Sequence, residues 1–247
     1  VVTNLWAGVA LVLFWLGRSN KIQTYELISY PIFILAFFSL TNDWNSFYAK
    51  WNHEALAPIF NISFLSNLLF IIALGIVSYL MMKNKNNSTE IEYPLIQTIA
   101  QYIITGMLLF VVFNIGRLEL FNYFDIQYKQ SLIVVNEAEG AWEYNSNIVD
   151  FRTVWFSIYV LSLAILMSLF NKKWLKIKVF GYFNMVFLSL AIVFFLTAGL
   201  YGISELRFNY LNASDNSYYA IGISNIVIRY FAILFALFSI IVLRKNV

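Results

Sequence analysis

The sequence predicts an all-α integral membrane protein, and three observations carry this prediction. Of the 247 residues, 61% are hydrophobic and only 12% are charged, whereas roughly a quarter of the residues in soluble globular domains are charged. Long apolar runs recur along the chain, most of them near the ~20 residues that a helix needs to cross the hydrocarbon layer. The 24 Phe, 16 Tyr and 7 Trp are typical of chains whose rings lie against lipid and at its two interfaces.

Seven apolar runs are expected to form the membrane-spanning helices. Within lipid each run must be helical, because a helix satisfies its own backbone hydrogen bonds. A transmembrane barrel is excluded, since its strands would be about 10 residues long with alternating polarity and these runs do not alternate. The expected spans are residues 1–17, 25–41, 63–82, 95–117, 153–170, 179–201 and 220–243.

The start of the chain suggests that something precedes it. The sequence begins at Val1 without an initiator Met, and its first apolar run is slightly short for a full span. A signal peptide is not indicated, because no basic segment comes before this run. We therefore expect residues 1–247 to be a single transmembrane domain from the C-terminal part of a longer multi-pass protein.

The distribution of Lys and Arg predicts the orientation of the spans. Short loops rich in basic residues stay in the cytoplasm, so we expect a bacterial inner-membrane protein whose C-terminus is cytoplasmic. The loops at residues 42–62, 118–152 and 202–219 then lie on the outer side. Most of the 16 basic residues fall on the expected cytoplasmic side, namely Arg18, Lys21, Lys83, Lys85, Lys172, Lys173, Lys176, Lys178, Arg244 and Lys245.

The order of loops and spans suggests one leading helix followed by three repeated helical hairpins, at residues 21–83, 92–173 and 176–245. The outward helices of the second and third hairpins end alike, in GRLELFNYF (residues 116–124) and GISELRFNYL (residues 202–211), each with a Glu three residues after a Gly. A helix pair that buries little surface alone gains by packing on its copies. An internal duplication is therefore expected.

Three segments carry a likeness to a known family: APIFNISFLSNLLFIIALGIVSYLMM (residues 57–82), the apolar stretch of residues 153–211, and RYFAILFALFSIIVLRKN (residues 229–246). With Asn61, Trp155, Trp174, Glu119 and Glu205 in place, they resemble the closing part of bacterial multi-spanning proteins known as domain of unknown function 2339. Members of that family are usually longer, with more helices upstream. The resemblance implies a helical membrane architecture and brings no established activity.

Charged residues inside or beside spans are rare and costly, so a functional hypothesis begins with them. The sequence places Arg229 well inside the last span, and Glu119 and Glu205 at the outer ends of two others. We hypothesise an outward-facing polar pocket lined by Arg117, Glu119, Glu205 and Arg229. The alternative is that these side chains lie at the interface, reach toward water and form ordinary ion pairs.

The first outer loop, residues 42–62, contains aromatic residues at helical spacing. Trp44, Phe47, Tyr48 and Trp51 would lie on one face of a helix. We expect a short amphipathic helix that lies flat in the outer interface with these rings in the lipid. The alternative is an aromatic platform for a sugar or a lipid head group.

The second outer loop, residues 118–152, is long and acidic. Its segments SLIVV and AWEY could form a short hairpin with Gly140 at the turn. Carboxylates of this kind serve glycosidases and calcium sites, but the loop lacks the spacing of an EF-hand. A solvated acidic loop is therefore expected, and no metal site.

The composition leaves two classes of function open. The chain has no Cys and a single His, His53, so cysteine and multi-histidine metal sites are excluded and no cofactor is expected. Nucleic-acid binding is not indicated either, since the basic residues form no continuous stripe. The first class handles an envelope lipid or carbohydrate at the outer face, as a transporter or a membrane enzyme. The second is a non-catalytic scaffold or assembly subunit that binds a protein partner, and whether the protein is an enzyme stays open.

Overall fold

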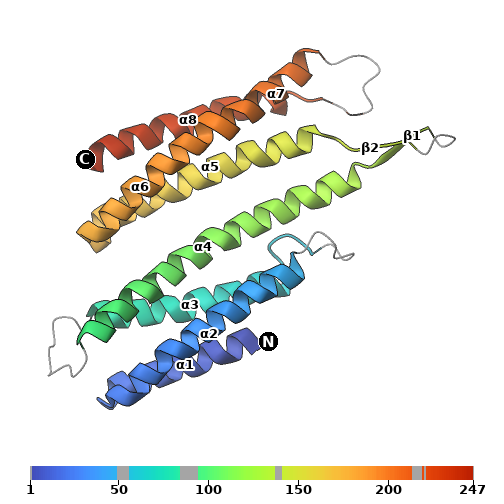
Figure 1. Ribbon diagram of the computed structural model, residues 1–247. Helices are drawn as coiled ribbons and strands as arrows, with labels where there is room; N and C mark the ends of the chain where they lie inside the picture. Colours follow the sequence, from blue (N-terminus) through green and yellow to red (C-terminus); the bar gives the residue numbers. More distant parts are fainter. Residues whose placement is uncertain are drawn as a thin grey trace. The chain divides into compact units, whose positions relative to one another are not determined.

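A computed structural model describes residues 2–48, 56–83, 94–136, 141–212, 219 and 221–246. Within these ranges seven helical segments are long and apolar enough to cross a membrane, which confirms the predicted all-α membrane fold with seven spans (Figure 1). The helices are α1 (Val2–Ser19), α2 (Gln23–Phe47), α3 (Ile62–Lys83), α4 (Pro94–Gln130), α5 (Asn147–Phe170), α6 (Lys178–Phe194), α7 (Leu200–Leu211) and α8 (Ser224–Asn246).

Two spans contain a π-helical turn. The turn at Phe195–Gly199 joins α6 and α7 into one span, Lys178–Leu211, and a second turn at Asn171–Leu175 continues α5. A Cβ atom on Gly199 would lie 2.9 Å from the Ser157 hydroxyl of α5. The π-turn therefore lies where α5 and this span approach closely, and glycine permits the approach.

The chain divides into two compact units, Val1–Asn122 and Tyr123–Val247. The boundary between the two units lies inside α4, and the expectation of a single transmembrane domain stays a prediction. This helix has 37 residues, far more than the ~20 that cross a membrane. Its last turns consequently belong to the second unit, together with α5 to α8.

In the first unit, α1 and α2 form a tight antiparallel pair. Small residues let the two backbones approach: a Cβ atom on Gly17 would lie only 2.7 Å from the backbone nitrogen of Glu26. At the other end of the pair, the Thr3 hydroxyl donates to the Asp43 carboxylate at 2.6 Å. The core of this unit contains the fully buried side chains of Phe14, Phe33, Leu40, Phe70 and Leu74.

In the second unit, α5 packs against α6, α7 and α8 around buried Val154, Leu161, Leu188 and Leu206. The hairpin expected in the second outer loop is present as antiparallel strands β1 (Ile133–Asn136) and β2 (Ala141–Glu143). The expected turn residue, Gly140, lies outside the described residues.

Two helices extend further than the sequence predicts. Residues 42–47 continue α2, and residues 118–130 continue α4, although both were expected in outer loops (residues 42–62 and 118–152). The extra turns bury apolar rings, since Trp44 and Phe124 are each 7% exposed. Tertiary packing thus stabilises helix beyond the ends of the apolar runs.

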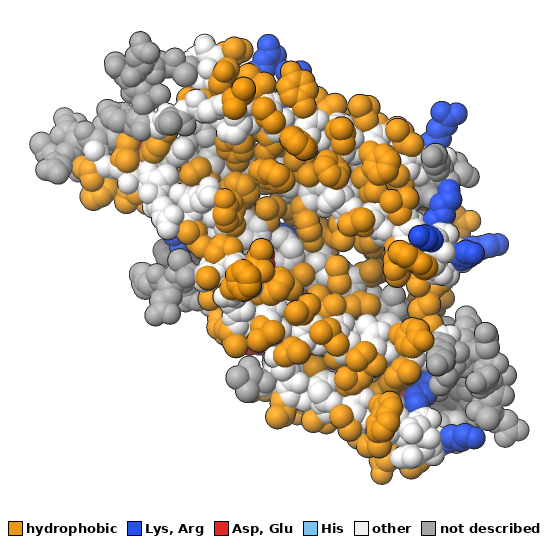
Figure 2. Space-filling model, turned by 180° about the vertical axis from the view of Figure 1, so that it is seen from behind, with side chains coloured by type: hydrophobic (Ala, Val, Ile, Leu, Met, Phe, Trp, Pro, Cys, Tyr) orange, Lys and Arg blue, Asp and Glu red, His pale blue; other side chains and the backbone are white. Residues whose placement is uncertain are grey.

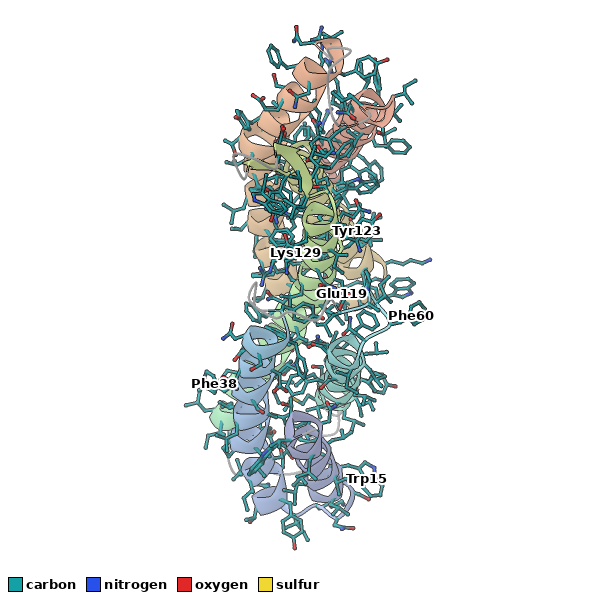
Figure 3. All side chains as sticks on the ribbon, turned by 90° about the vertical axis from the view of Figure 1, so that its right-hand side faces the viewer. Trp15, Phe38, Phe60, Glu119, Tyr123 and Lys129 are labelled. Atoms are coloured by element: carbon teal, nitrogen blue, oxygen red, sulfur yellow. The ribbon has the colours of Figure 1, made fainter. Side chains whose placement is uncertain are left out.

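The outward surfaces of the helices are apolar. Figure 2 shows hydrophobic side chains over the helices in view, and Figure 3 shows Trp15 and Phe38 pointing away from the helix bundle of the first unit. Phe38 of α2 and Leu166 of α5 are each 63% exposed. Surfaces of this kind are unfavourable in water, so they indicate contact with a lipid bilayer.

Candidate functional sites

Glu119, one of the four predicted pocket residues, is buried in the part of α4 that belongs to the first unit. Its side chain is 7% exposed. The Tyr48 hydroxyl donates to Oε1 at 2.5 Å, the Asn61 amide donates to Oε1 at 2.9 Å, and the backbone N–H of Ile59 donates to Oε2 at 2.7 Å. These three neutral donors replace the water that a buried carboxylate would otherwise need.

The segment of residues 56–61 is held to α4 by these contacts. It falls in the loop that the sequence predicts to be outer, and it is here called the outer turn. Ile59 has a φ of 66°, and the N–H of Phe60 donates to the carbonyl of Pro58 at 2.7 Å, which is a γ-turn with its central residue in a strained conformation. A β-branched residue at positive φ is an outlier that costs about 1–3 kcal/mol. The hydrogen bond from Ile59 to Glu119 offsets this strain.

Asn61 links the outer turn to the start of α3. Its side-chain oxygen accepts from the N–H of Phe64 at 2.7 Å, so it caps the helix, while its amide donates to Glu119. Asn122, one turn beyond Glu119, donates to the carbonyl of Leu56 at 2.9 Å. The outer turn is therefore fastened to α4 at both of its ends.

Tyr48 gives this site a predicted pH dependence. Burial, followed by the hydrogen bond to Glu119, raises the pKa of Tyr48 well above its usual 10.0. The folded state then holds this proton more tightly than the unfolded state, so the stabilisation is complete below about pH 10 and is lost as the pH rises toward the raised pKa. We expect the melting temperature of the protein in detergent to fall more steeply from about pH 10 to about 12 than that of Tyr48→Phe. At neutral pH the variant is expected to lose about 1–2 kcal/mol of stability. Equal slopes for the two proteins would contradict the assignment.

Of the other three predicted pocket residues, Arg117 is in the first unit with Glu119, and Glu205 and Arg229 are in the second. Arg117 turns to a different face of α4, where its Nε donates to Asn114 at 3.1 Å and its guanidinium lies over the ring of Phe121 at 5.8 Å. Glu205 of α7 and Arg229 of α8 are half-buried and belong to the second unit. A pocket lined by Arg117, Glu119, Glu205 and Arg229 therefore stays a prediction.

Glu205 has an acidic neighbour that the sequence reading did not include. It lies close enough to Asp150 of α5 for the two charges to repel. One turn further along α7, the Asn209 amide donates to the side chain of Asn147 at 2.8 Å. Asp125 in the same unit pairs with Arg152 at 2.5 Å. Among the described residues, no group of three or more His, Cys, Asp or Glu is arranged to hold a metal ion.

The predicted aromatic face divides among different surroundings. Trp44 is buried and donates through Nε1 to Asn67 of α3 at 2.6 Å, so it belongs to the core and not to an interfacial helix. Tyr48 binds Glu119, and Phe47 is partly exposed at the end of α2. Trp51 and His53 lie outside the described residues. The correction for Trp44 follows from the continuation of α2, which turns this ring inward.

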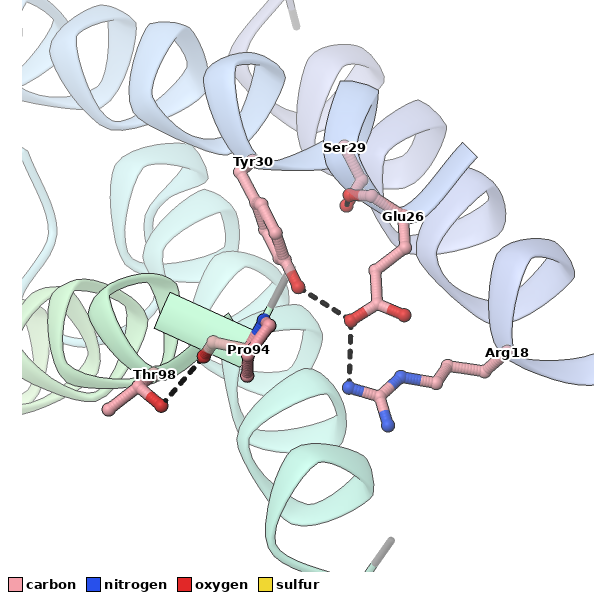
Figure 4. Close-up of polar contacts among 6 residues, drawn as sticks. All are labelled: Arg18, Glu26, Ser29, Tyr30, Pro94 and Thr98. Carbon is pink, nitrogen blue, oxygen red and sulfur yellow. Dashed lines mark hydrogen bonds and ion pairs between the residues drawn. The ribbon is translucent and has the colours of Figure 1, made fainter. Parts of the chain in front are cut away.

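A second buried carboxylate, Glu26, lies at the opposite end of the first unit. Arg18 donates to its Oε1 through Nη2 at 2.7 Å, and the Tyr30 hydroxyl donates to the same oxygen at 2.6 Å (Figure 4). The Glu26 side chain is only 5% exposed and that of Arg18 is 19% exposed. Sequence reasoning missed this cluster, although a Glu inside the second apolar run was a signal for it.

An apolar groove runs between α2 and α4 beside this cluster. Its volume is about 140 Å³, close to that of a cavity that holds one small apolar molecule. The ring pairs Phe37–Phe110 and Trp44–Phe110 join the two helices further along. The groove is lined by Tyr30, Phe33, Ile34, Ile96, Ile99, Ala100, Ile103, Ile104 and Met107.

Comparison of the chain with protein-family models, with curated proteins and with solved structures found no match in any of the three. The resemblance to domain of unknown function 2339 therefore stays a prediction.

Proposed function

We propose that this protein binds a membrane lipid and holds part of one acyl chain in the groove between α2 and α4. The single observation that carries the proposal is the lining of this groove, which is apolar apart from the hydroxyl of Tyr30. Both helices are candidate membrane spans, so an acyl chain is the apolar molecule most available to such a groove.

A lipid fits this groove better than a carbohydrate. The hydroxyl groups of a sugar would lose their hydrogen bonds to water and find none in return from a lining of Ile, Phe and Met side chains. An acyl chain has no such groups, and each methylene that leaves water contributes about 0.8 kcal/mol. The lipid half of the predicted "envelope lipid or carbohydrate" ligand is therefore the half that we retain.

The polar end of the lipid would lie near the Arg18, Glu26 and Tyr30 cluster. Tyr30 belongs to both features, since its side chain lines the groove and its hydroxyl donates to Glu26. By the distribution of basic residues this is the cytoplasmic end of the spans, so the proposed site lies in the inner half of a bacterial inner membrane. The outer-face pocket remains a separate hypothesis.

The second candidate function, a non-catalytic scaffold or assembly subunit, also has an observation in its favour. Several buried polar side chains are used to join helices to one another, as Trp44 and Asn67 join α2 to α3 and Asn184 joins α6 to the Ala164 carbonyl of α5. Such bonds fix the helices of the chain to one another and occupy polar groups that a catalytic site would use. A scaffold would keep its partner when the groove is filled.

Filling the groove tests the proposal. Ile99 and Ile72 are both 49% exposed on candidate spans, but only Ile99 lines the groove. We expect Ile99→Trp to reduce crosslinking of a photoactivatable phospholipid about tenfold, because displacing two methylenes is worth about 1.6 kcal/mol.

Ile72→Trp is the matched control and should crosslink like the unaltered protein. Equal crosslinking by all three proteins would overturn the groove as a lipid site, and so would an equal loss in both variants. Crosslinked peptides should come from α2 and α4, and mass spectrometry can identify them.

A further inference from the structure

The outer turn carries an apolar tip that no other feature of the first unit explains. Phe60 is 91% exposed, Ile59 is 53% exposed and Ile62, the first residue of α3, is 61% exposed. Figure 3 shows the Phe60 ring pointing away from the helices. Three exposed apolar side chains within four residues are costly in water, so this tip requires an apolar neighbour.

The tip is fixed by the strained conformation of the turn. The positive φ of Ile59 and the hydrogen bond from Phe60 to Pro58 reverse the chain at this point. Glu119 accepts the Ile59 N–H, and Asn61 binds Glu119 and caps α3 at the same time. The backbone of Ile59 and Phe60 is therefore held by contacts within the protein, while the side chains of these two residues are exposed.

The position of the tip indicates which neighbour it has. The candidate span of α2 ends at Phe47 and that of α3 begins at Ile62, so residues 59 and 60 lie at the level where spans leave the hydrocarbon layer. Aromatic rings concentrate at this depth in membrane proteins. The tip also offers no charge and no polar side chain that a sugar or a peptide would recognise.

We propose that the tip formed by Ile59, Phe60 and Ile62 inserts into the lipid–water interface, and that Glu119 is the positioning residue that keeps it there. The buried carboxylate holds the turn in its strained form, and the turn presents the Phe60 ring to lipid at the end of the spans opposite the groove. This role for Glu119 does not depend on the acyl-chain site between α2 and α4.

Spin labelling tests the insertion directly, because the chain contains no Cys and a single introduced Cys is the only labelled position. The labelled variant Phe60→Cys would be reconstituted in phospholipid nanodiscs. Its collision rates with oxygen, which prefers lipid, and with a water-soluble nickel complex would then be measured. Phe38→Cys on the exposed face of α2 serves as the lipid reference, and Asn20→Cys in the exposed α1–α2 loop serves as the water reference.

We expect the oxygen-to-nickel ratio at position 60 to lie between the two references and well above that of Asn20→Cys. A ratio equal to the water reference would overturn the insertion. Low collision rates with both reagents would overturn it as well, because they would place the tip against protein.

Adding Glu119→Gln to the labelled Phe60→Cys protein tests the positioning role. The glutamine amide places N–H groups next to the donors that Glu119 accepts from, so the turn should loosen. We expect a more mobile spin label and an oxygen-to-nickel ratio that moves toward that of the water reference. Glu143→Gln on exposed β2 is the matched control and should leave both quantities unchanged. An unchanged label in Glu119→Gln would overturn the role of Glu119 even if the tip is inserted. Lipid crosslinking in the groove should be the same in all of these variants.

Discussion

Arg18→Met is expected to destabilise the protein by about 3–5 kcal/mol, because it removes the cation from a buried ion pair and leaves the carboxylate behind. The Glu26 side chain is 5% exposed, and its Oε1 atom accepts from Arg18 and from the Tyr30 hydroxyl (Figure 4). In the variant, only the bond from Tyr30 to this oxygen remains. Methionine preserves most of the length and apolar character of the Arg18 side chain. The loss can be measured as the free energy of unfolding in mixed detergent micelles.

Two further variants separate the charge from the packing. Arg18→Met combined with Glu26→Gln removes both charges, so we expect it to recover much of the lost stability. Arg207→Met on the exposed side of α7 is the control for replacing an arginine and should change stability by less than about 1 kcal/mol. If Arg18→Met behaves like Arg207→Met, the ion pair contributes nothing of consequence to the fold.

Glu119→Leu is expected to have a comparable effect through a different mechanism. The substitution removes the acceptor for Tyr48, Asn61 and the backbone of Ile59. Each buried donor left without a partner costs about 1–3 kcal/mol, and the strain at Ile59 is no longer offset. The released turn can relax and reach water, which reduces this cost. We therefore expect the free energy of unfolding to fall by about 3–5 kcal/mol in total.

The loss in Glu119→Leu should be local as well as global. Limited proteolysis should cleave the variant within residues 56–61 much faster than the unaltered protein, since the turn is released from α4. Glu143→Leu, at an exposed position of β2, should show neither effect. A Glu119→Leu protein with full stability and a protected outer turn would contradict the role assigned to this carboxylate.

The sequence predicted the membrane-spanning segments because their signal is local. A run of about 20 apolar residues must be helical in lipid, whatever surrounds it, so the seven expected runs correspond to the seven candidate spans in the described part of the chain. The predicted ends of two spans were too early, because a local signal does not include contacts with distant residues. The extra turns of α2 and α4 bury Trp44 and Phe124. A window of neighbouring residues contains no information about that packing.

The two buried carboxylates show the same difference between what the local sequence predicts and what packing decides. Glu119 could be recognised as a residue of interest from its place at the end of a span, but its partners, Tyr48 and Asn61, lie 71 and 58 positions away. Glu26 stood inside an apolar run, yet only the close approach of α1 and α2 brings Arg18 to it. A buried charge needs partners, and the chain order does not say which ones.

The sequence by itself determined that this chain is helical, that its apolar runs are long enough to cross a membrane and where the rare charges lie, because these properties follow from the cost of bringing polar groups into lipid. Only the tertiary structure decided that the chain forms two compact units, that Glu119 fastens a strained turn and that α2 and α4 leave an apolar groove. Those features depend on which side chains meet across helices, and such meetings arise only when distant segments pack.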